Sequence, residues 1–516
     1  MTNANPATPF SVWTAVLPIT AVLLLSGWVS GQESAARSDG PVLKAPAIPE
    51  DVTGTLRSLN EALSKDVVPA DNAVVDLVQL FGVEAFDRSL RTDSLSLLGI
   101  ERVSKSGPEF LYLSPYVIAQ GAIVPEGRDR QLGELGEQLL AACQRPWTRA
   151  EFPELLDYLT ANRRALDAVV VAAGEPRYYA PMLSEEEPPR LMAAAFVIER
   201  RLQFLTQCLC ARGLLQAEDE SLPAALENVL ACRRWAVLLA VGSPFDVSAA
   251  KADVNDAIAF QAARAVLESG RLTGEQAALW LREWERVPRL PSPNRAADIG
   301  ERAILHQELE FLKSDEESVR GFFEVEGAAD DPELKEVRLT DLPWEPALQR
   351  ADEIQTGFVR ALATRDRGEQ DRQFDELDRD YLQWNATADA QYRKFPQLFK
   401  EDRAAASRWI GEAMAMSLRP WYRQRRMAED RTRVRRDLIT VGLALAAFRH
   451  ERGEYPAALS ELAPKYLPAV PLDAHSDDQF VYVRLAKDKT RLTSWGTNRT
   501  NDAGSGYNDD QSVELR

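Results

Sequence analysis

The sequence predicts a mainly α-helical protein: a multi-helix bundle or solenoid-like helical domain, followed by a small C-terminal α+β module. Between residues 51 and 313, apolar residues recur at helical spacing in segments separated by short turns, which is typical of stacked helices. After residue 435, a long helical stretch gives way to two β-rich runs, so we expect a long helix followed by an antiparallel β-hairpin and a loop. No clean repeat of fixed length is present, so a tetratricopeptide array is not predicted.

The first 31 residues differ from the rest of the chain. Residues 10–31 carry no charge and form an apolar run of about 20 residues, near the length that spans a bilayer. Val29 and Gly31 are small enough to precede a cleavage site, so we expect a signal peptide or an uncleaved membrane anchor, with a buried N-terminal helix as the third alternative. No Lys or Arg precedes this run, which leaves its orientation open. The small, polar, proline-containing residues 32–50 predict a flexible linker.

A helical domain is predicted over residues 51–313. Asp71 and Asn72 are suitable N-caps for a helix over residues 73–82. Residues 189–242 are expected to form a helical hairpin, because two strongly apolar segments flank a short polar turn. Further helices are predicted over residues 247–269, 274–286 and 296–313.

Acidic residues and prolines over 314–343 indicate a boundary segment. Helical signals resume as a helical extension over residues 344–434, with expected breaks near Lys394–Pro396 and at Pro420.

The end of the extension is rich in arginine. The run comprises Arg419, Arg423, Arg425, Arg426, Arg431, Arg433, Arg435 and Arg436. We interpret it as a solvated helix face whose charges pair with Glu429, Asp430 and acidic segments elsewhere. The alternative is a surface that docks onto an acidic partner or the inner leaflet.

The C-terminal module is predicted over residues 435–516. Its helix has one apolar face with steps of three and four, formed by Leu438, Val441, Leu445 and Phe448. Gly453 can take the left-handed conformation that ends a helix, and Pro456 prevents its continuation. The β-rich residues 480–485 and 491–495 flank a polar loop, which predicts a β-hairpin.

Short motifs follow one another in a fixed order along this module. They are Gly453-x-Tyr455-Pro456, Leu459-x-x-Leu462, Tyr466-Leu-Pro, Pro471-Leu-Asp473, Phe480-x-Tyr482 and Ser494-x-Gly496-x-Asn498, followed by an acidic loop. In this order the module resembles the globular head of the type II secretion major pseudopilin. Through Asp71-Asn-Ala-Val-Val-Asp-Leu77 and residues 146–181, the whole chain also resembles large uncharacterised exported bacterial proteins that end in such a tail.

The pseudopilin resemblance implies that the C-terminal loop binds calcium. The matching residues are Asn498, Asn501, Asp502, Asp509 and Asp510. Calcium prefers six to eight oxygen ligands, which carboxylates, amide oxygens and backbone carbonyls supply. Calcium is therefore the expected cofactor; the alternative is an Asx-rich surface turn without metal. The start of a pseudopilin is absent, because Thr14 stands at the fifth position from Phe10 where that family has Glu, so filament assembly is not implied.

Charge and motifs argue against several classes of function. The formal net charge of −18 repels phosphates, so we do not expect nucleic acid as a partner. The sequence has no Gly-rich phosphate loop, no His-Glu-x-x-His and no Gly-x-Ser-x-Gly, and its three histidines are scattered, so it carries no recognisable catalytic constellation. We interpret the four cysteines as buried core thiols, with a disulfide as the alternative: Cys143, Cys208, Cys210 and Cys232.

These observations predict a non-enzymatic cell-envelope protein, exported or anchored in the membrane by residues 10–31. Its helical domain would bind protein partners in the envelope, and its C-terminal module would bind calcium. One alternative is an envelope hydrolase that uses carboxylates in a cleft of the helical domain; converging acids in a deep pocket would favour it. The other alternative is a type II secretion-associated subunit. The sequence does not predict the oligomeric state.

Overall fold

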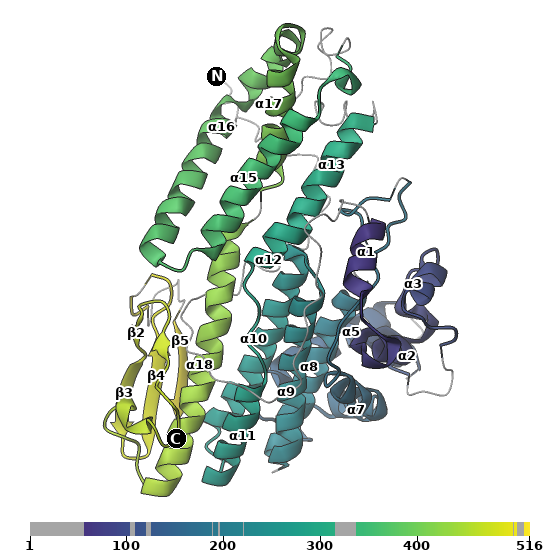
Figure 1. Cartoon of the computed structure of the whole chain (residues 1–516). Helices are drawn as coiled ribbons and strands as arrows, with labels where there is room; N and C mark the ends of the chain where they lie inside the picture. The colour runs from purple at the N-terminus through teal and green to yellow at the C-terminus, as the bar shows by residue number, and fades with distance from the viewer. Residues whose placement is uncertain are drawn as a thin grey trace, which may run out of the picture.

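The computed structural model describes residues 56–103, 109–119, 125–187, 189–194, 197–219, 221–314, 337–419, 421–498, 500–502 and 510–516. It confirms the predicted fold class: a mainly helical protein with small antiparallel sheets after a long helix. Figure 1 shows an elongated molecule in which most long helices lie side by side. The predicted signal or anchor segment, the linker 32–50 and most of the acidic segment 314–343 lie outside the described residues.

Helices account for most of the described chain. Their bounds are α1 Leu56–Ser64, α2 Ala73–Phe81, α3 Arg91–Leu97, α4 Leu113–Ala119, α5 Pro125–Ala142, α6 Pro153–Ala161, α7 Arg163–Ala172, α8 Val197–Glu218, α9 Leu222–Gly242, α10 Asp246–Glu268, α11 Gly274–Arg286, α12 Asn294–Ala296, α13 Arg302–Ser314, α15 Glu345–Ala363, α16 Arg367–Glu401, α17 Arg403–Ser417 and α18 Tyr422–Arg452. A π-helical turn, Ala297–Glu301, joins α12 to α13.

The larger hydrophobic core lies between α8, α9, α10 and α18 and continues into the C-terminal sheet. Leu443 of α18, Leu239 of α9 and Val513 of the last strand are fully buried members of this core. Gly442 allows α18 to approach α10 closely, because a Cβ there would lie 2.5 Å from Leu267, and Val513 of the last strand lies 3.7 Å from the same position. The C-terminal strands therefore pack directly on the helical body.

The smaller core lies between α13, α15, α16 and α17. Gly411 of α17 allows the closest contact with α15, since a Cβ there would lie 2.0 Å from the Ala347 carbonyl oxygen. In Figure 1 these helices form one end of the molecule, and α18 runs from them to the sheet. α18 thus contacts both halves of the structure.

The C-terminal sheet has three antiparallel strands in the order β3 (Val481–Ala486), β4 (Lys489–Ser494) and β5 (Gln511–Leu515). Leu492 of β4 pairs with Tyr482 on one side and Val513 on the other, so these three side chains face α18 and the core. Two shorter strands, β1 (Leu472–Asp473) and β2 (Asp478–Gln479), form a separate hairpin. The predicted β-hairpin is confirmed as β3–β4, although its turn is shorter than the expected loop.

The local signals for helix ends are largely confirmed. The Asn72 side chain accepts a hydrogen bond of 3.2 Å from the Val74 amide and caps α2 as predicted. Gly453 ends α18 with a positive φ of 78°. The predicted break near Pro396 is wrong, because α16 continues through it to Glu401. Burial of Phe395 and Phe399 on either side of this proline offsets the hydrogen bond that proline cannot donate.

Candidate functional site

A cavity of about 560 Å³ lies where α15 turns into α16, facing α18 and the segment before α12. Four arginines and one glutamate line it: Arg365, Arg367, Arg426, Arg433 and Glu429. The remaining lining residues are small or uncharged, Ser292 and Asn294 among them. Two other cavities, of about 20 and 40 Å³, have room for one or a few water molecules only. We call the large one the arginine cavity.

The first wall of the arginine cavity is one face of α18. Arg426, Glu429 and Arg433 are three and four residues apart, so they share this face. The Glu429 carboxylate accepts from both arginines, at 2.9 Å from Arg426 Nη1 and 2.6 Å from Arg433 Nη2. Glu429 therefore holds the two guanidinium groups close together, while the side chains of Arg426 and Arg433 stay 13% and 17% exposed.

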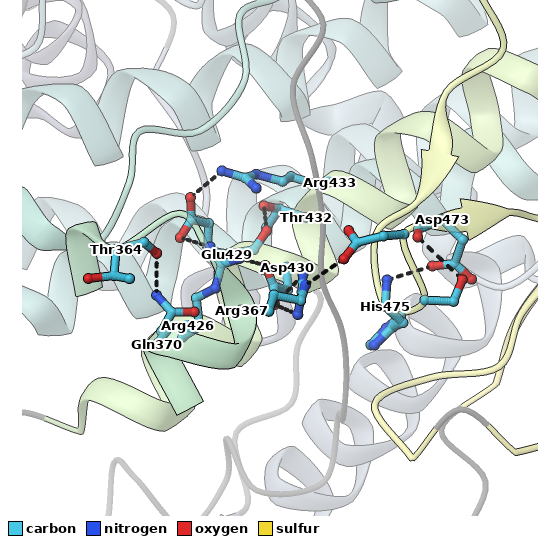
Figure 2. Close-up of polar contacts among 12 residues, drawn as sticks. Thr364, Arg367, Gln370, Arg426, Glu429, Asp430, Thr432, Arg433, Asp473 and His475 are labelled. Atoms are coloured by element: carbon cyan, nitrogen blue, oxygen red, sulfur yellow. Dashed lines mark hydrogen bonds and ion pairs between the residues drawn. The ribbon is translucent and has the colours of Figure 1, made fainter. Parts of the chain in front are cut away.

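The second wall is the turn between α15 and α16. Asp366 caps α16 by accepting a 2.7 Å hydrogen bond from the Glu369 amide. Gln370 closes the turn, since its side-chain amide donates to the carbonyl oxygen of Thr364 at 3.0 Å (Figure 2). The same amide donates to the carbonyl oxygen of Ala361 at 2.9 Å. This fixed turn presents Arg365, which is exposed, and Arg367 at the cavity.

Asp430 connects the two walls. Its carboxylate is 3.1 Å from Arg426 Nη2 and 3.4 Å from Arg367 Nη1, and its side chain is 6% exposed. Burial raises the pKa of Asp430 from 3.8 to about 6, and the arginines Arg426 and Arg367 oppose that rise. The charged form of Asp430 is therefore stabilised by two arginines that also face the cavity.

Arg367 extends the same network to the C-terminal module. Its Nε is 3.7 Å from the Asp477 carboxylate in the β1–β2 turn, where Asp477 has a positive φ of 57°. In the same turn the Asp473 carboxylate accepts a hydrogen bond of 3.0 Å from the His475 amide (Figure 2). One arginine of the cavity thus links the helical extension, α18 and the C-terminal hairpin.

This arrangement can bind anions. A guanidinium group has five donors in a planar fork that matches carboxylate and phosphate oxygens. Ion pairs of guanidinium groups are stronger where water is largely excluded, as it is around Arg426 and Arg433. Glu429 is the one acid that lines the cavity in the described part of the chain, and two arginines hold it, so the lining shows no pair of converging acids.

The solvated face predicted for the arginine run is wrong for much of its length. The predicted pairing is present, but the run lies largely inside the protein. Arg435 is 5% exposed and donates a hydrogen bond of 2.9 Å to Asp253 of α10, and Arg425 forms an ion pair with Asp246 at 2.8 Å. Hydrophobic spacing could not reveal this, because the acidic partners are about 180 residues away in sequence. One signal was available: Arg426, Glu429 and Arg433 have the spacing of a single helix face.

The predicted calcium residues gather only in part within the described structure. The Asn498 side-chain amide donates to the Asp502 carboxylate at 2.7 Å, and the Asp502 amide donates to the Asp510 carboxylate at 3.0 Å. Asn498 also accepts from the Thr500 amide at 2.7 Å, as in an Asx turn. Asn501 is exposed beside them, and Asp509 lies outside the described residues. Calcium binding here stays a prediction.

The four cysteines are buried and free, as the interpretation of core thiols predicted. They lie together between α5, α8 and α9; the Cys210 thiol, for example, is 3.7 Å from the Cys143 carbonyl oxygen. Burial raises the pKa of the Cys208 and Cys232 thiols well above the ordinary value. These thiols are therefore protonated and poor nucleophiles at neutral pH.

Within the described ranges, no group of three or more His, Cys, Asp or Glu side chains could hold a metal ion. Among the described helices, none combines the length and the hydropathy needed to cross a bilayer.

Comparison with protein-family models, curated proteins and solved structures finds no match for this chain.

Proposed function

We propose that the protein is a non-enzymatic binding protein of the cell envelope that takes an anionic ligand into the arginine cavity. One observation carries the proposal: four arginines line a single cavity of about 560 Å³ in a chain whose net charge is −18. Guanidinium groups that line one cavity repel one another unless negative charges lie between them. An anionic ligand would compensate this repulsion.

Arg365 supports the proposal most directly. It is exposed at the rim of the cavity, and no ion pair holds it within the described part of the chain. Arg426 and Arg433 each form one bond to Glu429, and a guanidinium group carries five donors. The envelope location rests on the apolar residues 10–31, which precede the described structure.

The envelope hydrolase is the less favoured alternative. A hydrolase that uses two carboxylates needs an acid and a base that both reach the substrate. In the arginine cavity, Glu429 is held between two arginines, and Asp430 lies behind them with its side chain 6% exposed. This geometry favours binding of a negative charge over proton transfer.

Calorimetric titration tests the proposal, with pyrophosphate and tricarballylate as probes at low ionic strength. We expect saturable binding of at least one probe, weakened about tenfold in Arg365→Gln, because a charged hydrogen bond contributes about 1.5 kcal/mol. Arg365 is exposed, so this variant keeps the fold. Arg372→Gln is the matched control, since Arg372 lies on α16 shortly after the turn that carries Arg365, is 71% exposed and is outside the cavity lining. Equal binding by both variants, or no binding of either probe, would refute the proposed site.

A further inference from the structure

Arginines outnumber acids in the lining of the arginine cavity. Four guanidinium groups, from Arg365, Arg367, Arg426 and Arg433, line it, and Glu429 is the one carboxylate among its described lining residues. Asp430 and Asp477 pair with these arginines from outside the lining. Protonation of Asp430 would therefore free positive charge beside the cavity.

The Asp430 carboxylate lies where an oxyanion group of a ligand would meet the arginines of both walls. Its two oxygens each form an ion pair with an arginine of one wall, Oδ1 with Arg426 at 3.1 Å and Oδ2 with Arg367 at 3.4 Å. These two guanidinium groups are the ones that an anion between the two walls would need. Glu429 differs, because both of its partners, Arg426 and Arg433, belong to α18 and it holds one wall together.

We propose that the arginine cavity takes a ligand with two or more oxyanion groups, and that Asp430 takes up a proton when the ligand replaces it on Arg367 and Arg426. The proposal rests on the anion-binding function proposed above. In the binding step a proton from the solvent adds to the Asp430 carboxylate, and the N–H groups that this releases donate to oxygens of the ligand. No covalent bond is made or broken.

The surroundings of Asp430 make this exchange accessible near neutral pH. Its pKa is about 6 while Arg426 and Arg367 still stabilise the charged form, and losing them to a ligand would raise the pKa further. The charged groups that face it are Arg426, Glu429 and Arg433 of α18, Arg367 of α16, and Asp477 of the β1–β2 turn beyond Arg367. His475 is a second titratable group of that turn, and the experiment must separate it from Asp430.

The cavity also indicates the chemical class of the ligand. Its four arginines stand on two elements around a space of about 560 Å³, which is much larger than one small anion, so a ligand with two or more oxyanion groups can contact more of them at once. None of the residues that line it in the described chain is aromatic, so the site has no platform on which a base or a sugar ring could stack. Recognition therefore depends on the number of oxyanion groups.

Sulfonates are suitable probes, because strong acids keep the same charge throughout the pH range of the test. We would titrate the full chain with methanesulfonate and with propane-1,3-disulfonate at about pH 5.5 and about pH 7.5. We expect the disulfonate to bind more tightly than the monosulfonate. We also expect the disulfonate to bind up to about twentyfold more tightly at the lower pH than at the higher pH, because the protonated fraction of Asp430 differs by about that factor for a pKa of about 6. Buffers of different ionisation enthalpy would report uptake of close to one proton per ligand at the higher pH.

Three variants separate the possible sources of this effect. Asp430→Asn should bind the disulfonate at the higher pH as tightly as the parent protein does at the lower pH, without proton uptake. Glu429→Gln should retain the pH dependence, because Asp430 is still present, and so should His475→Gln. Circular dichroism and thermal melting would confirm that each variant folds.

The outcomes distinguish this inference from the proposed function. Binding that depends on Arg365 but not on pH, or that is unchanged in Asp430→Asn, would overturn the exchange and leave the anion site intact. Equal affinity for both sulfonates would overturn the ligand class. Absence of binding for every probe at both pH values, including in Asp430→Asn, would overturn the proposed function itself.

Discussion

The first half of α18, up to Asp437, is rich in arginine, whereas the buried side chains of the second half, from Leu438, are almost all apolar. Leu438, Val441 and Leu445 are fully buried in the larger core. In the first half, Arg425, Arg426 and Arg435 are largely buried as well, but acidic partners hold them. One helix therefore combines two ways of burying its side chains, and they differ in sensitivity to pH and to ligands.

The apolar half should be the more sensitive to truncation. Leu445→Ala removes a fully buried side chain and leaves a cavity, so we expect a loss of about 3 kcal/mol in the free energy of unfolding. Leu382→Ala on α16 is the control, because Leu382 is 65% exposed and should change stability by less than about 0.5 kcal/mol. Urea unfolding of both variants measures the difference. Similar losses in the two variants would contradict the assignment of the core.

The polar half should lose somewhat less when one ion-pair partner is removed. Arg425 is 2.8 Å from Asp246, and the Asp246 backbone amide donates a hydrogen bond to the Glu301 carboxylate. Burial raises the pKa of Asp246, and it raises the pKa of Glu301 to about 7. Arg425→Gln leaves these acids without their cation, so we expect a loss of about 2 kcal/mol in the free energy of unfolding at neutral pH.

Arg286→Gln is the matched control for that variant. Arg286 is 57% exposed and pairs with Glu283 three residues away, so its loss should cost less than about 1 kcal/mol. Thermal or urea unfolding at about pH 7.5 compares the two. The Arg425 variant should also recover stability at lower pH, where its acids are protonated; a loss that is the same at both pH values would argue against this cause.

A pH series on Asp430 sharpens the contrast between the halves. Its pKa rises from 3.8 unfolded to about 6 folded, so its contribution to stability is fully present below about pH 4 and is lost as the pH rises to about 6. Relative to Asp430→Asn, which does not titrate, we expect the parent protein to lose about 2 kcal/mol across this range. Urea unfolding at several pH values measures it. A difference between the two proteins that stays constant with pH would contradict the raised pKa.

Calcium should have the smallest effect on stability. It would bind the C-terminal module, which packs on the apolar half of α18. If the loop with Asn498, Asp502 and Asp510 binds calcium, a concentration ten times the dissociation constant stabilises the fold by about 1.4 kcal/mol. We expect a higher melting temperature in calcium than in chelator, and no such difference in Asp502→Ala. Magnesium serves as the control ion. An unchanged melting temperature in millimolar calcium would favour the Asx turn without metal.

Much of the helical framework was predictable, because its signals are local. Asn72 caps its helix, Gly453 ends another, and the steps of three and four along Leu438 to Phe448 mark a buried face. The wrong break at Pro396 shows the limit of such signals. A proline normally interrupts a helix, but the packing of Phe395 and Phe399 in the smaller core carries α16 across it.

The candidate site was less predictable. The arginine run was evident in the sequence, yet nothing local distinguishes an exposed arginine from a buried, paired one. Arg435 is buried because Asp253 lies opposite it, and Arg367 reaches both Asp430 and Asp477 because a turn, a helix and a hairpin meet there. These partners are separated by about 60 to 180 residues, so their meeting depends on how the helices pack.

The sequence by itself determined the helical class, the ends of several helices, the β3–β4 hairpin and the apolar face of α18. These features follow from periodicity and from the backbone preferences of Gly, Pro and Asn, which act over a few residues. Only the tertiary structure decided which arginines are buried and which acids face them. It also decided that four arginines line one cavity. Electrostatic environment depends on solvent exclusion and on distances across elements, and these exist only once the chain has folded.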